Sequence, residues 1–312
     1  MSKEDDLSLV ERLREKDHTN AMREIMLRVP LAHSRANKLT DSDNAAPLKH
    51  PKGTVPALAN SLMVISYLNS KAPEAQTLAE ISSTLHLTKS HCHSILRTLV
   101  YFEWLGFDDR HKTYKLLPSA ISDLSSLFTS PLLEIVRICL SEFVEQINLP
   151  CVLAQPLTDG SFVVIDTFRS RRYFDAFYTV GHRFPRNASA HMRALIAWSG
   201  EECIQKHLAD WQPQKYTAFT PTTRKQIEEE LVATRERGYS LSIDELSENL
   251  TAIAMPVFDR SGEVVYIVSC SFPSGEYDFN HQKISTNLRK AIDHIHLQSI
   301  ATVPVEFRKA ES

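Results

Sequence analysis

Residues 77–116 read TLAEISSTLHLTKSHCHSILRTLVYFEWLGFDDRHKTYKL and decide the fold of the N-terminal part of the chain. Thr77 and Glu80 have the spacing of a capping box, in which each side chain bonds the free backbone N–H of the other residue. Thr88 suits the N-cap of a further helix. A polar turn at residues 108–112, between two short runs of strand-forming residues, predicts a hairpin.

The helical pattern begins before this stretch, at Pro56, because the first turn of a helix tolerates proline. Apolar residues then recur at helical spacing, at Leu58, Leu62, Ile65 and Leu68. Three helices followed by a hairpin are typical of a winged helix-turn-helix domain, which we place at residues 55–117.

The helix that follows Thr88 would be the recognition helix, whose N-terminal end enters the major groove of DNA. Its polar face holds no acid and consists of Thr88, Lys89, Ser90, His91, His93, Ser94 and Arg97. Short polar side chains there can reach base edges, and cations can hold phosphates. The hairpin tip adds Arg110 and Lys112. We expect these residues to contact double-stranded operator DNA, although each taken singly also suits an ordinary solvated surface.

The charge of the chain does not by itself indicate strong DNA binding. The chain has a net charge of −3, and residues 55–117 carry six Lys/Arg against five Asp/Glu. Electrostatic affinity for DNA depends on the number of phosphates that a protein neutralises. We therefore expect affinity to depend on base contacts and on a homodimer. The run His91-Cys92-His93 points in different directions on a helix, so no metal site is expected there.

The composition is that of an ordinary globular protein, with 43% hydrophobic and 23% charged residues. No apolar run is long enough to span a membrane, and the N-terminus does not resemble a signal peptide, so a cytoplasmic protein is expected. The five scattered cysteines form no CxxC pair. The motifs G-x-S-x-G and HExxH, a phosphate loop and a dinucleotide turn are absent, so neither catalytic residues nor a cofactor is expected.

Strand and helix patterns alternate in the rest of the chain, and tight turns such as Thr158-Asp159-Gly160 join the strands. This order predicts an α+β domain with an antiparallel sheet and flanking helices. The whole chain then divides into an N-terminal extension (1–54, a helix plus a linker), the winged helix-turn-helix domain (55–117), a linker helix (118–130), an effector domain (131–303) and a tail (304–312).

Over about residues 55–300 the chain resembles the IclR family of bacterial regulators. The resemblance is carried by the order and spacing of VPALANSLMVISYL, TLAEISSTLHLTKSHCHSILRTLVYFEWL, VGHRFPRNASAHMRALIA, RERGYSLSIDE and LTAIAMPVFDRSGEVVYIVSCSFP. It implies a GAF-like effector domain and dimers that often pair into tetramers. Family members often have Arg where this chain has Asn60 and Ser94. Both departures remove a phosphate or base contact, so the operator sequence cannot be transferred.

The resemblance also implies a small-molecule effector site between the sheet and a loop–helix segment. Its positions correspond here to Ala190, His191, Met192, Ser242, Ala252, Ser269 and Ser271. Because Ser269 and Ser271 are two apart on one strand, they point to one face. Hydroxyls together with N–H groups at a helix start suit a carboxylate.

Several departures make this site less polar than in relatives that bind small oxo-acids. The common Gly-Lys is Met192-Arg193 here, a frequent Asp is Ser242, and a frequent Cys is Ala252. An aromatic-rich strand over residues 173–180, which includes Phe177, would add a bulky wall. The expected effector is therefore an organic acid, with aromatic acids included. The same aromatic side chains would serve equally well as plain core.

Two other functions stay open at this stage. The chain could be an enzyme with an incidental helix-turn-helix, in which Asp244 and Glu245 near His191 supply acid–base chemistry. Alternatively, it could be a DNA-binding regulator controlled by a protein partner. Turnover of a candidate ligand would reveal the first, and a ligand that raises the melting temperature would argue against the second.

Overall fold

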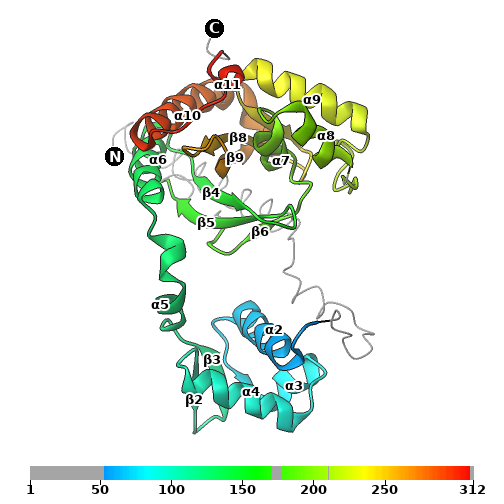
Figure 1. Cartoon of the computed structure of the whole chain (residues 1–312), viewed down its shortest axis with the longest axis vertical. Helices are drawn as coiled ribbons and strands as arrows, with labels where there is room; N and C mark the ends of the chain where they lie inside the picture. Colours follow the sequence, from blue (N-terminus) through cyan, green and yellow to red (C-terminus); the bar gives the residue numbers. More distant parts are fainter. Residues whose placement is uncertain (1–52, 171–177, 210, 310–312) are drawn as a thin grey trace, which may run out of the picture. The chain divides into compact units, whose positions relative to one another are not determined.

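The computed structural model describes residues 53–170, 178–209 and 211–309. The chain forms two compact units, with the boundary between Ser130 and Pro131 (Figure 1). Each unit has its own hydrophobic core, and the two cores share no residue. The expectations for residues 1–52 and for most of the strand over residues 173–180 lie outside the described residues.

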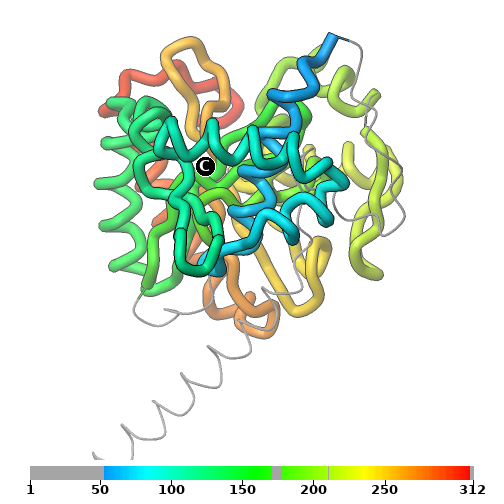
Figure 2. The backbone as a smooth tube through the Cα atoms, turned by 90° about the horizontal axis from the view of Figure 1, so that it is seen from below, coloured from blue at the N-terminus to red at the C-terminus, as the bar shows by residue number. Residues whose placement is uncertain are grey.

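The N-terminal unit is a winged helix-turn-helix, and Figure 2 traces its backbone from blue to teal. Its described elements are α2 (Pro56–Lys71), β1 (Gln76–Thr77), α3 (Leu78–Thr84), α4 (Lys89–Tyr101), β2 (Leu105–Asp108), β3 (Thr113–Leu116), α5 (Ala120–Leu124) and the 3-10 turn η2 (Ser125–Phe128). The strands form a sheet in the order β1-β3-β2, and β2 and β3 are the predicted hairpin.

The helices of this unit begin at the predicted signals. Both bonds of the capping box between Thr77 and Glu80 are present at the start of α3. The Thr88 side chain accepts a hydrogen bond from the backbone N–H of His91 at the start of α4. The apolar faces of α2, α3 and α4 then meet in one core, where the side chains of Val64, Ile81 and Leu96 are fully buried.

The linker over residues 118–130 differs from the single helix that its pattern predicts. It forms the short helix α5, followed by the 3-10 turn η2. Serine hydroxyls bond to backbone carbonyls in this segment, Ser119 to Glu103 and Ser125 to Ser122. The Ser125 bond lies where α5 gives way to η2, and such a bond competes with a regular helix.

The C-terminal unit is the predicted α+β domain. Its described elements are α6 (Pro131–Ile147), β4 (Cys151–Pro156), β5 (Phe162–Phe168), β6 (Arg183–Phe184), α7 (Ser189–Ile196), α8 (Glu201–Ala209), α9 (Arg224–Arg237), β7 (Ser240–Ile243), β8 (Leu250–Phe258), β9 (Val264–Pro273), the 3-10 turn η3 (Ser274–Glu276), α10 (Tyr277–Ser299) and α11 (Val305–Lys309). The strands form one antiparallel sheet in the order β6-β5-β4-β9-β8-β7.

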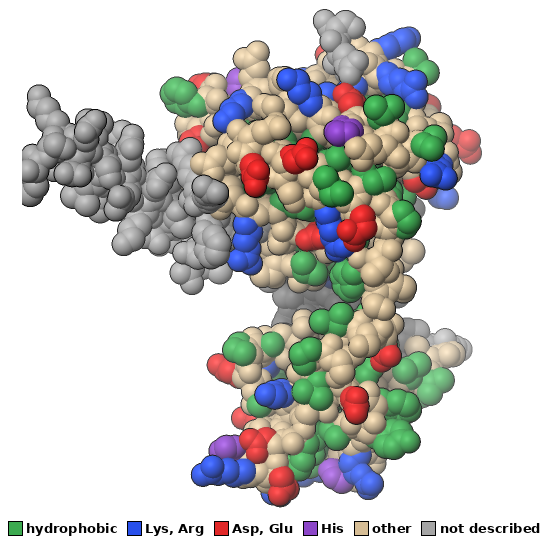
Figure 3. All heavy atoms as spheres, turned by 90° about the vertical axis from the view of Figure 1, so that its left-hand side faces the viewer, with side chains coloured by type: hydrophobic (Ala, Val, Ile, Leu, Met, Phe, Trp, Pro, Cys, Tyr) green, Lys and Arg blue, Asp and Glu red, His purple; other side chains and the backbone are tan. Residues whose placement is uncertain are grey.

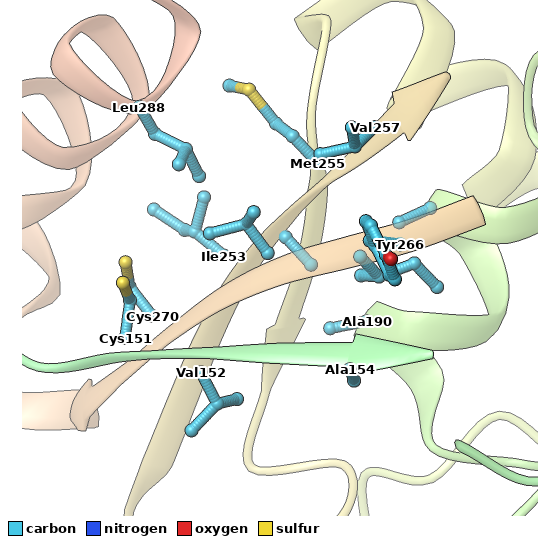
Figure 4. Close-up of a cluster of buried hydrophobic side chains, with 14 of the residues drawn as sticks. Cys151, Val152, Ala154, Ala190, Ile253, Met255, Val257, Tyr266, Cys270 and Leu288 are labelled. Carbon is cyan, nitrogen blue, oxygen red and sulfur yellow. The ribbon is translucent and has the colours of Figure 1, made fainter. Parts of the chain in front are cut away.

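The two faces of this sheet are covered by different helices. Helices α6 and α10 pack together on one face, above the sheet in Figure 1. Cys151 points to the same side as Leu288 of α10, whereas Val152 points to the opposite side of β4 (Figure 4). Helix α7 contacts β7, β8 and β9. We call the face to which Val152 and Ser269 point the α7 face, since these two residues are paired across β4 and β9.

Part of the predicted tail over residues 304–312 forms a helix, because residues 305–309 fold as α11. Helix α11 inserts the fully buried Phe307 into the core. The ring packs edge-on against Trp198 and Phe258, and the Arg289 guanidinium lies 4.1 Å from its centroid. A five-residue helix with one anchoring side chain has no periodic pattern to reveal it.

Candidate DNA-binding face and effector site

Helix α4 has one buried and one exposed face. Its buried face consists of Cys92, Ile95, Leu96 and Leu99. The exposed residues include almost all of those predicted to contact DNA, namely Thr88, Lys89, Ser90, His93, Ser94 and Arg97. A helix that turns basic and hydroxyl side chains outward, with no acid in its first turn, suits the major groove.

His91 differs from the other predicted DNA contacts because it is half-buried. Its ring Nε2 lies 3.0 Å from the Nδ2 of Asn60, which belongs to α2 and is 9% exposed. The local sequence gives no signal for this contact, since the two residues are 31 positions apart.

The tip of the hairpin holds the predicted contacts Arg110 and Lys112, and both are exposed. Acidic residues lie beside them. Asp108 accepts hydrogen bonds from the backbone N–H groups of Arg110 and His111 and pairs with the His111 ring at 2.7 Å, while Lys112 pairs with Asp109 at 2.6 Å. The bond from His111, together with the backbone bonds, lowers the pKa of the Asp108 carboxyl. The wing therefore places acidic side chains directly beside its cations.

The surface of the N-terminal unit reflects this mixture. Basic, acidic and histidine side chains lie side by side at its lower end in Figure 3. The field that this unit offers to a phosphate backbone is correspondingly weak, as the near balance of charges over residues 55–117 indicates.

In the C-terminal unit, the structure brings two predicted effector residues into contact. His191 of α7 is 3% exposed, and its Nε2 lies 3.1 Å from the Ser269 hydroxyl on β9. Ser242, Ala252 and Ser271 are paired in one row across β7, β8 and β9, two residues along from the row of Ser269. They therefore share the α7 face with Ser269.

Aromatic rings continue this site from His191 toward β6. Phe184 stacks on the His191 ring with centroids 4.3 Å apart, and Phe162 lies 5.4 Å from the same ring. Tyr178 and His182 pack on Phe184 and on each other. Burial lowers the pKa of His191 to about 3 and that of His182 to about 4. Both imidazoles are therefore neutral members of a largely apolar wall.

Three further predicted residues take different places. Ala190 is buried in the core. Met192 lines a cavity of about 10 Å³ together with Leu208 and Trp211, which has room for about one water molecule. Phe177 lies outside the described residues.

Two polar features of the α7 region bear on what it could bind. Helix α7 has Ala188 as its N-cap and no side-chain cap, and the N–H groups of a helical first turn lack partners within the helix. The buried hydroxyl of Ser240, on the α7 face opposite Ala254, has no hydrogen-bond partner among the described residues. Such groups are rare in folded proteins.

The sequence did not reveal the buried ion pair between Arg193 and Glu245. Arg193 is fully buried and donates to the Glu245 carboxylate and to the Leu241 carbonyl. Asp244, beside it, accepts a hydrogen bond from Ser274 at 2.6 Å. Of the two acids considered for acid–base chemistry, Glu245 therefore ties α7 to the loop after β7, and Asp244 ties the same loop to η3.

No helix in residues 53–170, 178–209 or 211–309 combines the length and apolar character needed to cross a membrane. The same part of the chain holds no cluster of three His, Cys, Asp or Glu side chains suited to a metal ion.

Known proteins with similar sequences are transcriptional regulators. The HTH-type transcriptional regulator XynR of Escherichia coli K12 is 26% identical over 229 residues, which cover 72% of this chain and 88% of XynR. The Pca regulon regulatory protein of Pseudomonas putida is 23% identical over 216 residues, covering 69% of this chain and 73% of that protein.

Solved structures share the fold. An IclR transcriptional regulator from Alicyclobacillus acidocaldarius matches with a TM-score of 0.68 at 23% identity, covering 79% of this chain and 99% of that one. An IclR homologue from Microbacterium hydrocarbonoxydans, complexed with 4-hydroxybenzoate, matches with a TM-score of 0.64 at 20% identity, covering 79% and 100%.

Two family domains account for most of the described chain. Residues 57–109 match the IclR helix-turn-helix domain, and residues 125–297 match the domain described as bacterial transcriptional regulator IclR C-terminal. The second match alone spans more than half of the 312 residues. The chain therefore belongs to the IclR family of bacterial DNA-binding transcriptional regulators.

Proposed function

We propose that this regulator binds operator DNA through α4 and the wing, and that a small organic acid on the α7 face modulates this binding. The proposal assigns base and phosphate contacts to the exposed residues of α4, and phosphate contacts to Arg110 and Lys112. A homodimer would present two winged helices to paired half-sites. No catalytic step is part of the proposed function.

The proposed effector site rests mainly on the hydrogen bond between His191 and Ser269. The His191 ring also stacks on Phe184. The hydrogen bond joins α7 to β9 at the point where a polar sheet face meets an apolar wall. A planar ring fits against such a wall, and a carboxylate suits the hydroxyls and the uncapped start of α7. Since both imidazoles are neutral, hydrogen bonds rather than an ion pair would hold the carboxylate there.

An aromatic acid is the first class to test. The structural relative complexed with 4-hydroxybenzoate supports this choice. The composition of the α7 face supports it too, because β7, β8 and β9 present small side chains, namely Ser240, Ser242, Ala252, Ala254, Ser269 and Ser271. Small side chains opposite an aromatic wall favour a flat, bulky ligand.

The test is thermal unfolding of the full chain with 4-hydroxybenzoate, benzoate, cyclohexanecarboxylate and the neutral 4-hydroxybenzamide. An aromatic acid at 100 times its Kd should stabilise the protein by about 2.7 kcal/mol. It should also change the affinity for operator DNA. Ser269→Ala should weaken this response, and the control Ser261→Ala, in the exposed turn after β8, should not.

A broad panel of organic acids that leaves the melting temperature unchanged would reject the effector proposal. A regulator controlled by a protein partner would then be the better account. Stabilisation by the neutral amide as strongly as by the acid would instead show that the carboxylate is not recognised.

A further inference from the structure

Asn60 occupies an unusual place for a polar residue of the N-terminal unit. It lies on α2, one turn after Pro56, and only 9% of its surface is exposed. Its side-chain amide is directed at α4 rather than at solvent, 3.0 Å from the Nε2 of His91. The amide nitrogen can only donate, so Nε2 accepts and the ring proton of a neutral His91 is on Nδ1.

His91 is fixed at both ends. It is the third residue of α4, and its backbone N–H bonds to the Thr88 hydroxyl at 3.3 Å. Its ring is held by Asn60. The two bonds join the first turn of α4 to its own N-cap and to α2. By contrast, His93, two positions further along, is exposed.

We infer that Asn60 and His91 are positioning residues that fix the first turn of the recognition helix against α2, and that base reading belongs to Ser90, His93, Ser94 and Arg97. The reasoning is geometric. The N-terminal turn of a recognition helix approaches the bases most closely, so a bond between helices at that turn sets the distance and angle of every reading side chain. The His91 ring is half-buried and its Nε2 is already hydrogen-bonded, so it has fewer free polar atoms to offer to a base edge.

This inference rests on the proposed placement of α4 in the major groove, and it predicts a distinct pattern of defects. Loss of a positioning bond should weaken binding to every sequence by a similar factor, because all reading residues shift together. Loss of a reading residue should change the order of preference among sequences.

The experiment uses the full chain and a DNA site selected from random fragments by the unmodified protein. Affinities are measured for that site and for a set of its single-base-pair substitutions, with Asn60→Ala, His91→Ala, the double variant, and His93→Ala as the matched exposed control. Asn60→Ala and His91→Ala should each weaken all sites by roughly 3- to 10-fold and preserve the order of preference. The double variant should bind no more weakly than the weaker single variant.

His91→Gln provides a rescue, because its Oε1 can accept from Asn60 in place of Nε2. It should bind close to the unmodified protein, and it keeps the test decisive if His91→Ala lowers the melting temperature. A merely structural defect would lower the melting temperature. It would not make the double variant bind DNA as well as the weaker of the two single variants.

Three results would overturn the inference. A changed order of preference in His91→Ala, with none in Asn60→Ala, would make His91 a reading residue. Unchanged affinity in both single variants would show that their bond positions nothing. If instead His93→Ala, Asn60→Ala and His91→Ala all leave DNA binding unaltered, the placement of α4 in the groove is wrong, and the inference falls with it.

Discussion

At the scale of single residues, the buried His191 and His296 and the half-buried His182 of the C-terminal unit make its stability depend on pH. Burial lowers the pKa of His191 to about 3 and those of His182 and His296 to about 4, against about 6.5 in an unfolded chain. Below about pH 6 the unfolded chain therefore binds protons that the folded unit does not. The stabilisation is complete above about pH 6.5 and is lost as the pH falls toward 4.

We predict that the free energy of unfolding of this unit falls by up to about 4 kcal/mol per pH unit between about pH 6 and 4.5. Urea titrations at several pH values measure this slope. His296→Gln should reduce this slope by about a third, because it removes one of the three histidines. The variant should stay folded, since a glutamine oxygen can still accept from the Phe258 N–H, which His296 now binds at 3.0 Å. The exposed His294 offers a control in His294→Gln. An unchanged slope in His296→Gln would contradict the prediction.

Residue-level reasoning from the sequence succeeded where the relevant neighbours are local. Alternation along a strand placed Ser269 and Ser271 on one face, and the register confirms that they share it. It failed for polar partners set by tertiary packing. Asn60 and Glu245 meet partners 31 and 52 positions away, so no local pattern reveals them. From the sequence, Asn60 was a lost DNA contact and Glu245 a candidate acid or base.

At the scale of elements, α5 depends on its attachment to the winged domain. A five-residue helix is too short to be stable alone, and α5 buries none of its residues. The Trp104 indole N–H donates to the Asp123 carboxylate at 2.7 Å, and the Ser119 hydroxyl donates to the Glu103 carbonyl at 2.5 Å. These bonds make the first half of the linker part of the N-terminal unit.

Asp123→Ala should therefore loosen α5 without affecting α4. We expect hydrogen exchange over residues 120–124 to become about five-fold faster, as loss of one hydrogen bond of about 1 kcal/mol implies. Exchange in α4 should stay the same. Asp109→Ala, which removes the partner of Lys112 on the wing, is a matched control. Equal exchange of α5 in both variants would show that the Trp104 bond does not hold it.

Length and capping explain which elements the sequence predicted. Helices α3 and α4 carry side-chain caps and an apolar stripe, and both begin where these signals stand. The two-residue strand β1 and the five-residue helix α11 have too few residues for a period to appear. The apolar spacing of the linker predicts one helix, but the Ser125 hydroxyl bonds the Ser122 carbonyl where α5 gives way to η2.

At the scale of the whole molecule, the low net charge of each winged unit makes the affinity for DNA depend on how many winged units bind. The net charge is −3, and residues 55–117 are nearly balanced. We therefore expect each winged unit to offer few phosphate contacts, and acids at the wing tip pair with His111 and Lys112. We predict that tight operator binding therefore needs more than one winged unit on the same DNA.

Lys89→Ala should reveal that number. Each lost phosphate contact reduces the slope of log K against log salt concentration by about 0.9 on double-stranded DNA. A dimer with both winged units bound should lose about 1.8, and a single bound unit about 0.9, with a similar relative loss of affinity for all sequences. Lys225→Ala, on the exposed face of α9 beside Glu229, should leave the slope unchanged. No change in Lys89→Ala would remove Lys89 from the phosphate contacts, and a loss near 0.9 would count against two winged units binding one site.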